Sequence, residues 1–394
     1  METKTVVAVV TVGDRYVGTS LPFEADRVWW PEIEDATAQL DALLGVRTVV
    51  LRLVHTGERQ NGRGGLSVYH VQADREPAPG VLDATPNEWS EGLTRPEPRR
   101  ASWAEVDGPR RMIEWASEIL GTSDWVQVKT WNLSCLIRFD GAWAKATSTF
   151  CSVDADVIRQ VQQYDAQLGP AVLGVDLERR WSLLAHAPGS DCWEPDAETV
   201  DNVLTRWVAV QAALPTADLG TPRLLPNELA GHLTRLLAGE AGVQLNATEH
   251  AQARELVDQL PGIVAELDES GLPITLVHGD FHPGNWRSDG TTRMIVDWAD
   301  AFVGHPAADV RRLYDWLPTE KREHAATVWA AAWKHHLPAS DPLRALAPMA
   351  VVQALYGAVL YQKFLDHIEP SERVYHATDP AAGIRAACVA AGNL

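Results

Sequence analysis

The chain has 394 residues, which is enough for two or three domains and for a large core without disulfides or metals. Its 34 Lys and Arg against 53 Asp and Glu give a net charge of −19, which argues against a general binder of nucleic acids or of anionic membranes. A hydrophobic content of 46% and a charged content of 22% exclude a disordered or fibrous chain.

The first 76 residues predict a small α/β domain. Strands are expected at 5–12, 46–54 and 66–71, and a helix at 31–44. A glycine-rich loop at 61–65 joins the last two strands, and no helix follows it that would make it a phosphate site. We therefore expect a hairpin turn at 61–65. A proline-rich connector is expected at 77–101.

Residues 102–187 predict a second, β-rich part. A helix is expected at 109–120, followed by a meander of three short strands at 125–131, 135–139 and 142–146. Asp140-Gly141 is typical of the tight turn between the last two of these strands. A further helix to about residue 168 and a strand at 181–186 complete this part.

Residues 188–394 are predicted to be mainly helical, so the fold class is α+β. The expected helices are 197–214, 228–237, 249–267, 307–316, 320–335 and 346–365. A polar stretch at 276–304 interrupts them, and such a loop on a rigid scaffold is typical of a functional site.

Cellular location is inferred from what the chain lacks. Its four cysteines are scattered and predict neither a zinc site nor a disulfide framework. The apolar run Val6–Val12 is too short for a signal peptide, and no run of 18 or more apolar residues predicts a transmembrane helix. We expect a cytoplasmic protein with reduced thiols.

Three oxygen-bearing side chains stand out in the polar stretch. Asp280 is followed by Asn285 five residues later and by Asp297 17 residues later. Phosphoryl transfer from a nucleotide needs a carboxylate for the acceptor hydroxyl, oxygen ligands for Mg²⁺ and a cation on the phosphates. These residues supply the carboxylate and the ligands. Asp289-Gly290 predicts a hairpin turn between Asn285 and Asp297.

The sequence of this stretch resembles a known superfamily. His278–Asn285 reads HGDFHPGN, which resembles the catalytic loop of the aminoglycoside phosphotransferases and choline kinases. Ile295–Trp298, IVDW, resembles their metal-binding segment, and residues 301–309 are similar to its continuation. The resemblance implies a protein-kinase-like fold with a β-rich small lobe (102–187) and a helical large lobe (188–394), preceded by the small α/β domain.

Residues from Trp103 to Leu394 are also similar to actinobacterial phosphotransferases that carry an extra domain before the kinase-like part. That domain is Nudix-like in some of them. Residues 1–75 contain no Nudix box, so we do not expect this domain to hydrolyse a substrate.

The resemblance implies a role for each matching residue of the large lobe. Asp280 is expected to be the catalytic base, and Asn285 and Asp297 are expected to bind Mg²⁺. His278 is expected to support the loop, and Asp309 to brace the start of the next helix.

The small lobe is expected to bind the nucleotide, either ATP or GTP. Lys145 is one of only six lysines and falls on the strand where the family has its phosphate-binding lysine. An edge-strand lysine that prevents aggregation is the alternative. Ser134, in the loop 131–134, is a candidate phosphate contact, and Leu184 and His186 are candidate contacts of the base.

The chain departs from the family at one point. The family pairs its strand lysine with a glutamate on the next helix, but residues 151–168 contain no Glu. Either Asp154 or Asp156 takes its place, or the pair is absent. A second hypothesis is therefore a catalytically weak nucleotide-binding regulatory protein. A third, a metal hydrolase with His278, Asp280 and His282 as ligands, explains neither Asn285 nor Lys145.

The acceptor is expected to be a hydroxyl of a small molecule. Aminoglycosides, which would make the enzyme an antibiotic-resistance factor, amino sugars, related natural products and choline-type alcohols all fit. An acidic run at 191–201 is either a solvated helix start or a patch for a cationic acceptor. Asp300 is either a supporting acid or a substrate contact, and Trp298 and Trp316 are the tryptophans expected to touch a ligand.

Overall fold

The computed structural model describes residues 3–57, 62–216 and 219–394, which form two compact units. Unit 1 takes the described residues of 1–148, 173–185 and 367–375. Unit 2 takes those of 149–172, 186–366 and 376–394. The front α/β region and the strands of the kinase-like small lobe thus fall in one compact unit, and the domain boundaries at 76, 101 and 187 stay a prediction.

The first sheet of unit 1 contains the expected strands at the front of the chain. Its order is β2-β1-β5-β4, with β3 also paired to β1, and β1 runs parallel to β5. The strands are β1 (Lys4–Val12), β2 (Arg15–Thr19), β3 (Phe23–Ala25), β4 (Thr48–Thr56) and β5 (Gly65–Ala73). The antiparallel pairing of β4 and β5 agrees with the hairpin prediction, although 58–61, including Asn61, lie outside the described residues.

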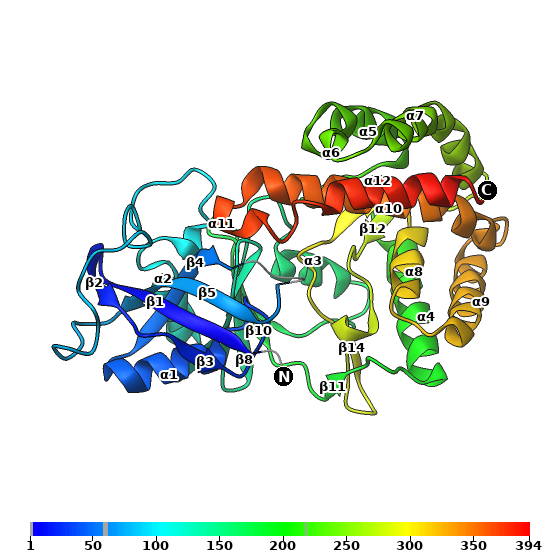
Figure 1. The fold of residues 1–394 in the computed structure, drawn as a ribbon. Helices are drawn as coiled ribbons and strands as arrows, with labels where there is room; N and C mark the ends of the chain where they lie inside the picture. The colour runs from blue at the N-terminus through cyan, green and yellow to red at the C-terminus, as the bar shows by residue number, and fades with distance from the viewer. Residues whose placement is uncertain (1–2, 58–61, 217–218) are drawn as a thin grey trace. The chain divides into compact units, whose positions relative to one another are not determined.

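Alternation of side chains along β1 explains how this sheet is covered. Val6, Ala8 and Val10 pack with Leu40 of α1 (Glu34–Leu44), which lies along one face of the sheet in Figure 1. Val7 and Val9 point to the opposite face and join a separate core. Because both faces of β1 are covered, the strand is apolar without a break from Val6 to Val10.

The second sheet of unit 1 is the predicted meander with two further strands. Its order is β6-β7-β8-β10-β9, and α2 (Gly108–Leu120) packs on it through Met112 and Ile113. The strands are β6 (Trp125–Thr130), β7 (Ser134–Phe139), β8 (Ala142–Thr147), β9 (Val172–Asp176) and β10 (Trp181–Ala185). A short 3₁₀ helix, η1 (Ser102–Ala104), precedes α2.

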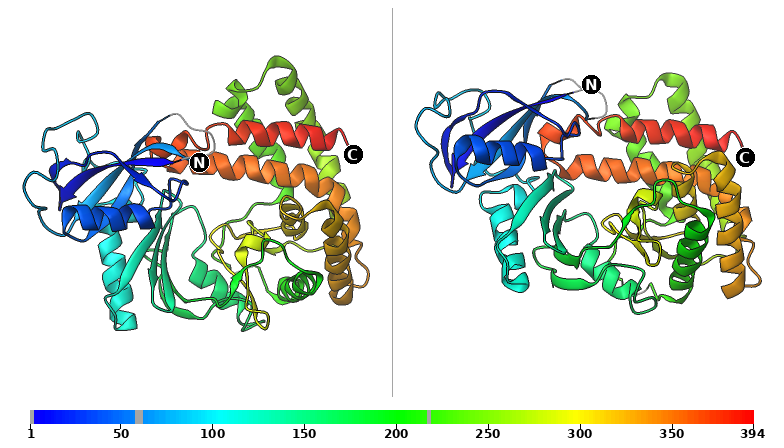
Figure 2. Two further views of the ribbon diagram at one scale, coloured as in Figure 1. Left: turned by 60° about the horizontal axis from the view of Figure 1, so that its bottom comes forward. Right: turned by 90° about the horizontal axis from the view of Figure 1, so that it is seen from below.

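Unit 2 is built from helices, as expected for its sequence (Figure 2). The helices are α3 (Asp154–Val161), α4 (Ala197–Ala213), α5 (Leu229–Ala238), α6 (Glu240–Val243), α7 (Ala247–Asp268), α8 (Ala307–Tyr314), α9 (Thr319–His336), α10 (Leu346–His367) and α12 (Asp379–Ala391). Short 3₁₀ turns are η2 (Pro226–Glu228), η3 (Pro283–Asn285) and η4 (Pro342–Ala345). We did not predict α12. It packs on α10 at Gly383, where a Cβ atom would lie 2.9 Å from the Ala354 carbonyl oxygen.

Short strands in unit 2 frame the polar stretch. β12 (Thr275–Val277) pairs with β15 (Phe302–Gly304), and β13 (Trp286–Ser288) pairs with β14 (Arg293–Ile295). The second pair is the hairpin predicted from Asp289-Gly290. β11 (Ser190–Asp191) extends it through β13.

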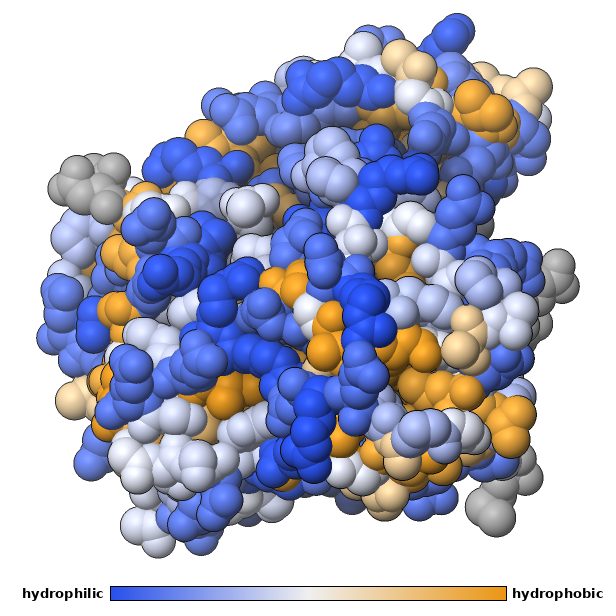
Figure 3. All heavy atoms as spheres, turned by 90° about the vertical axis from the view of Figure 1, so that its left-hand side faces the viewer, coloured by the Kyte–Doolittle hydropathy of each residue, from blue (hydrophilic) through white to orange (hydrophobic). Residues whose placement is uncertain are grey.

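One helical stretch of unit 2, Pro342–His367, is long and apolar enough to cross a membrane by length and composition alone. Core helices meet the same two criteria, and Val351, Val352 and Leu355 are buried in the protein. On the face drawn in Figure 3, hydrophilic side chains predominate and apolar ones are scattered among them.

Candidate active site

The loop 278–285 begins directly after β12, and one buried carboxylate holds its first two residues. Asp309, in the first turn of α8, accepts hydrogen bonds from the backbone N–H of His278 (3.1 Å) and of Gly279 (3.2 Å). The side chains of Trp207 (2.8 Å) and Gln211 (3.2 Å) also donate to it. Burial raises the pKa of Asp309 to about 7, although these donors oppose the rise. Asp309 thus ties the loop to α4 and α8.

Gly279 makes the turn that leads into Asp280. Its φ is +84°, and a Cβ atom there would lie 2.1 Å from the carbonyl oxygen of Asp300. Only glycine has both the required backbone angle and the space. This close approach places the start of the loop against Asp300, which is half-buried.

His278 is buried and holds the loop to the segment that precedes Asp297. Its Nε2 lies 3.0 Å from the carbonyl oxygen of Val296, and its ring packs against Trp298 with centroids 4.6 Å apart. Burial lowers the pKa of His278 to about 4, so the ring is neutral at neutral pH and Nε2 donates. These contacts are those of a structural support.

Trp298 lies in the core of unit 2 and does not face a ligand. Its side chain is 0% exposed and packs edge-on against Trp207. Its indole donates to the carbonyl of Ile295 (3.0 Å), and its backbone N–H donates to Asp154 Oδ1 (2.9 Å). The expectation of a ligand contact at Trp298 is therefore corrected, because tertiary packing encloses the whole ring.

The Asp280 carboxylate is held at both oxygens. Oδ1 accepts hydrogen bonds from Arg312 Nε (3.0 Å) and Nη2 (2.9 Å). Oδ2 lies 3.3 Å from both His282 Nε2 and Asn285 Nδ2. Because His282 Nδ1 accepts from the backbone N–H of Gly284 (3.1 Å), the ring proton belongs on Nε2 and points at Asp280. The carboxylate is thus oriented yet 29% exposed.

These partners also set the charge of Asp280. Burial raises the pKa of this carboxyl, but the hydrogen bond from His282 and the positive charge of Arg312 outweigh burial and hold it well below its usual range. Asp280 is therefore ionised at any pH at which the protein would work. The same bonds argue against a metal hydrolase, because His278 and Asp280 are directed at Val296 and Arg312.

Arg312 is a site residue that our sequence analysis missed. It lies three residues after Asp309 on α8, so both side chains project from adjacent turns of one helix face. Arg312 also pairs with Asp315 (3.1 Å) and lies over the ring of Trp316 at 5.4 Å. The sequence signal for Arg312 was its position three residues after Asp309, on the same face of the helix. That spacing does not show which residue of the loop the guanidinium contacts.

Replacing Arg312 by methionine is expected to raise the pKa of Asp280 toward its usual range, so that protonation of Asp280 adds an acid limb to the pH–rate profile at a higher pH than in wild type. The guanidinium favours the ionised carboxylate, so without it the carboxylate is protonated, and activity lost, at a higher pH. The measurement is kcat/KM for phosphoryl transfer against pH. Arg311→Met, whose guanidinium lies over Tyr314 instead, is the matched control. Superimposable acid limbs for wild type and Arg312→Met would contradict the assignment.

Asn285 and Asp297 lie on neighbouring backbone segments and suit a magnesium ion. The Asn285 carbonyl oxygen accepts from the backbone N–H of Val296 (2.9 Å), so the next residue, Asp297, follows directly beside it. Asn285 Nδ2 donates to the Asp280 carbonyl oxygen (2.9 Å), which orients the amide and leaves its Oδ1 for a cation. Asp297 is exposed and has a φ of +63°, a strained angle often seen at functional sites. An amide oxygen and a carboxylate are ligands that Mg²⁺ accepts together with substrate phosphates.

Two exposed tryptophans lie next to the loop. Trp193 is 48% exposed and stacks on the His282 ring at 5.2 Å, and Trp316 is 43% exposed and lies 5.3 Å from Trp193. Gly284 makes room for Trp193, because a Cβ atom there would lie 2.2 Å from the indole. We expected Trp316 near a ligand but missed Trp193. Its signal, a tryptophan within the acidic run, was overlooked.

Most of that acidic run is engaged within unit 2. Asp196 caps the N-terminus of α4, and the other partners are arginines and a histidine. The pairs are Asp191–Arg287 (2.6 Å), Glu198–Arg293 (2.8 Å) and Asp201–His324 (2.6 Å). These contacts favour the structural alternative for the run as a whole. Glu194, next to Trp193, is exposed.

The candidate nucleotide residues lie in or next to unit 1. Lys145 lies on β8, paired with Leu136 on one side and Ser182 on the other, so the edge-strand alternative is wrong. Ser134 begins β7, and its hydroxyl oxygen accepts from Trp131 Nε1 (2.9 Å).

The strand that was expected to contact the base ends at a boundary between the units. Leu184 lies on β10, the last unit 1 residue of this segment is Ala185, and the exposed His186 is the first of unit 2. Asp154 and Asp156 both lie on α3 in unit 2, where Asp156 accepts from Gln160 (3.4 Å).

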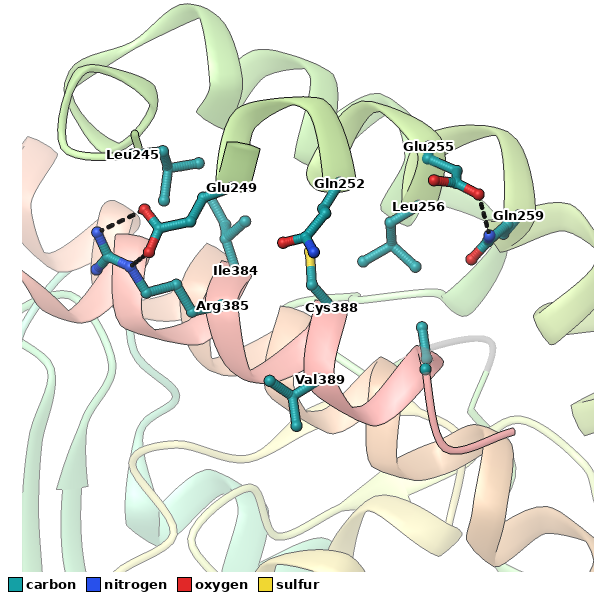
Figure 4. Close-up of a pocket in the computed structure, with 12 residues that line it drawn as sticks. Leu245, Glu249, Gln252, Glu255, Leu256, Gln259, Ile384, Arg385, Cys388 and Val389 are labelled. Carbon is teal, nitrogen blue, oxygen red and sulfur yellow. Dashed lines mark hydrogen bonds and ion pairs between the residues drawn. The ribbon is translucent and has the colours of Figure 1, made fainter. Parts of the chain in front are cut away.

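A pocket of about 480 Å³ lies elsewhere in unit 2, between α7 and α12 (Figure 4). Leu256, Ile384 and Cys388 line it, and the ion pair between Arg385 and Glu249 (2.9 Å) lies at one end. Burial raises the pKa of Cys388, so its thiol is no activated nucleophile. The pocket contains none of the residues predicted for catalysis.

Comparison with known proteins agrees with this geometry. Residues 155–346, which contain the loop, the hairpin and α8, match the phosphotransferase enzyme family. This part of the chain belongs to the phosphotransferase enzyme family. The chain is accordingly a small-molecule phosphotransferase of a family that uses a nucleoside triphosphate as co-substrate. No curated protein matches its sequence.

Solved structures share the kinase-like fold with this phosphotransferase. Choline kinase LicA of Streptococcus pneumoniae is 12% identical to this chain with a TM-score of 0.53, and the match covers 71% of this chain and 99% of LicA. The GDP complex of aminoglycoside 2'-phosphotransferase-IIIa is 12% identical with a TM-score of 0.50, and the match covers 73% of this chain and 98% of that enzyme. An ethanolamine kinase of Plasmodium vivax is 11% identical with a TM-score of 0.50, and the match covers 69% of this chain and 86% of that kinase. The fold prediction is confirmed, with a mixed sheet in addition at the N-terminus.

Proposed function

We propose that the chain transfers the γ-phosphoryl group of ATP or GTP to a hydroxyl of an amino sugar, an aminoglycoside or a related natural product. The observation that carries the proposal is the ionised Asp280 carboxylate, which is fixed at both oxygens. One of its partners, His282, lies against two exposed indoles. A cytoplasmic location and a role in antibiotic resistance fit this function and are part of the proposal.

Asp280 orients the acceptor hydroxyl and takes its proton. The hydroxyl oxygen forms a bond to the γ-phosphorus while the bond from that phosphorus to the β,γ-bridging oxygen breaks, and the nucleoside diphosphate leaves with that oxygen. Because Arg312 and His282 keep Asp280 a weak base, the proton moves late, and positioning supplies most of the acceleration. An oriented carboxylate suits this loose transition state.

Asn285 and Asp297 would hold Mg²⁺. When bound, the ion neutralises charge on the phosphates. In the proposal, Lys145 and Ser134 of unit 1 contact the phosphates, and Leu184 and His186 contact the base. Support for these four roles comes from the resemblance to the family and from their positions at the start of β7, on β8 and at the end of β10.

The acceptor is proposed to lie on Trp193 and Trp316. The C–H face of a sugar ring packs well on an indole, and an amino group gains from the ring face and from an acidic neighbour such as Glu194. Asp300, against which Gly279 turns, is a second candidate for an acceptor contact. A choline-type alcohol would use the same rings without the sugar hydroxyls.

Replacing Trp193 by alanine is expected to raise the KM for the acceptor about tenfold or more and to leave the KM for the nucleotide unchanged. The loss of the stacking surface is specific to the acceptor. An acceptor panel read by release of the nucleoside diphosphate identifies the substrate, and steady-state kinetics then give both constants. Leu343→Ala, also an exposed apolar residue of unit 2, is the control. Equal rises in both KM values would contradict this acceptor site.

The alternative, a nucleotide-binding regulatory protein with weak activity, is motivated by the missing glutamate at 151–168. It would be favoured if ATP or GTP raised the unfolding temperature while no acceptor in the panel, and no water, received a phosphoryl group. Magnesium-dependent hydrolysis of the nucleotide without acceptor would favour the enzyme instead.

A further inference from the structure

A short segment far along the chain belongs to the N-terminal unit. The chain leaves unit 2 after Asp366, runs through unit 1 as residues 367–375 and re-enters unit 2 at His376. We call residues 367–375 the strap. It contains the single-turn helix α11 (Pro370–Arg373), which lies against β4 in Figure 1.

Buried charges anchor the middle of the strap to the first sheet. Glu369 pairs with Arg52 of β4 (3.3 Å) and with Arg100 (3.3 Å), and all three side chains are nearly excluded from water. Ser371 donates its hydroxyl to the carbonyl of Leu53 on β4 (2.9 Å). Breaking one partner of a buried ion pair leaves an uncompensated charge, so these contacts set the strap's position strongly.

An aromatic contact anchors the end of the strap. Tyr375 stacks on Trp30 with centroids 4.9 Å apart and an interplanar angle of 13°. Its hydroxyl donates to Thr56 at the end of β4 (2.9 Å). The strap is therefore fixed to the N-terminal sheet by residues on both sides of Glu372.

From this anchored strap, two groups hold one residue of the loop 131–134. The Glu372 carboxyl Oε2 accepts the backbone N–H of Asn132 at 2.7 Å, across 240 residues of sequence. The backbone N–H of Glu369 donates to the Asn132 side-chain oxygen (3.4 Å). Glu372 is 3% exposed, and burial raises its pKa to about 8. The hydrogen bond from Asn132 compensates for part of the cost of burying this carboxyl group.

The loop itself needs external support. Residues 131–134, Trp-Asn-Leu-Ser, contain no glycine and join β6 to β7. Within the loop, Trp131 N–H donates to the carbonyl of Ser134 (3.0 Å), and outside it Trp103 Nε1 donates to the carbonyl of Trp131 (3.0 Å). Glu372 supplies the partner for the backbone N–H of Asn132. The backbone N–H of Ser148 also donates to the carbonyl of Leu133 (3.3 Å), so the loop is held by Trp103, by Ser148 and by the strap.

We propose that Glu372 is a positioning residue for the nucleotide, and that the N-terminal sheet acts in phosphoryl transfer by holding the strap against the loop 131–134. The inference rests on the proposed function, because it takes this loop as the one that contacts the nucleotide phosphates. A loop that is already ordered loses less conformational entropy when the nucleotide binds. Loosening the loop therefore weakens nucleotide binding. The acceptor side, built on unit 2, is untouched.

Replacing Glu372 by alanine is therefore expected to raise the KM for the nucleotide about tenfold or more while kcat and the KM for the acceptor change less than about twofold. Glu372→Gln keeps one oxygen for Asn132 and is expected to have a smaller effect in the same direction. Val374→Ala, at a 59% exposed position of the same strap, is the control and is expected to match wild type. Thermal unfolding establishes that each variant is folded.

An unchanged nucleotide KM in folded Glu372→Ala overturns the inference, and so does an equal rise in both KM values, which would mark a merely structural residue. If Glu372→Ala does not fold, Glu372→Gln decides by the same two criteria. If wild type has no nucleotide-dependent turnover, the proposed function fails. Calorimetric binding of a non-hydrolysable nucleotide to wild type and to the variants then tests the strap separately, and equal affinities overturn it.

Discussion

Replacing Asp280 by asparagine is expected to lower kcat about 100-fold to 10,000-fold while nucleotide affinity stays near that of wild type. An amide cannot accept the acceptor's proton, and it removes the ion pair between Arg312 and the residue that faces the acceptor, leaving Arg312 paired with Asp315. The nucleotide loses no direct contact in the proposed site. The measurements are steady-state release of the nucleoside diphosphate with the best acceptor, and calorimetric titration of the nucleotide.

Asp289→Asn is the matched control for this experiment. Asp289 lies in the exposed turn between β13 and β14, where its carboxylate accepts the backbone N–H groups of Thr291 and Thr292. An asparagine oxygen accepts the same bonds, so activity should be unchanged. Turnover like wild type in Asp280→Asn would remove Asp280 from catalysis.

Replacing Asp309 by alanine is expected to produce the largest loss of stability, about 3 kcal/mol or more in the free energy of unfolding. The backbone N–H groups of His278 and Gly279, and the side chains of Trp207 and Gln211, would lose a buried acceptor. Each donor left without a partner away from water costs about 1–3 kcal/mol, and relaxation recovers part of the sum. Urea unfolding followed by circular dichroism measures the change.

The control for stability is Asp315→Ala, at the C-terminal end of the same helix. Asp315 is more than half exposed and pairs with Arg312, so its loss should cost less than about 1 kcal/mol. If Asp309→Ala retains activity, its kcat should be lower than that of wild type, because the loop that carries Asp280 would no longer be held. A variant as stable as wild type would show that Asp309 does not support the loop.

Local sequence patterns predicted most of the regular structure. The long helices of unit 2 and the strands of the meander have apolar residues at periods that persist over several turns or along a whole strand, so their type follows from the sequence. β2, β3 and β9 were missed because they are three to five residues long and partly exposed, which leaves little periodicity. Helix α12, which has an alanine-rich sequence, was also missed.

The sequence by itself indicated the kind of chemistry: the motifs HGDFHPGN and IVDW, which contain Asp280, Asn285 and Asp297, resemble those of a phosphotransferase family. Those residues are neighbours along the chain, so the local fold brings them together. Tertiary structure alone decided that Arg312 neutralises Asp280, that Trp193 rather than Trp298 is exposed, and that Glu372 holds Asn132. The physical reason is that each of these contacts joins elements distant in sequence, and which side chains meet depends on packing that no local period encodes.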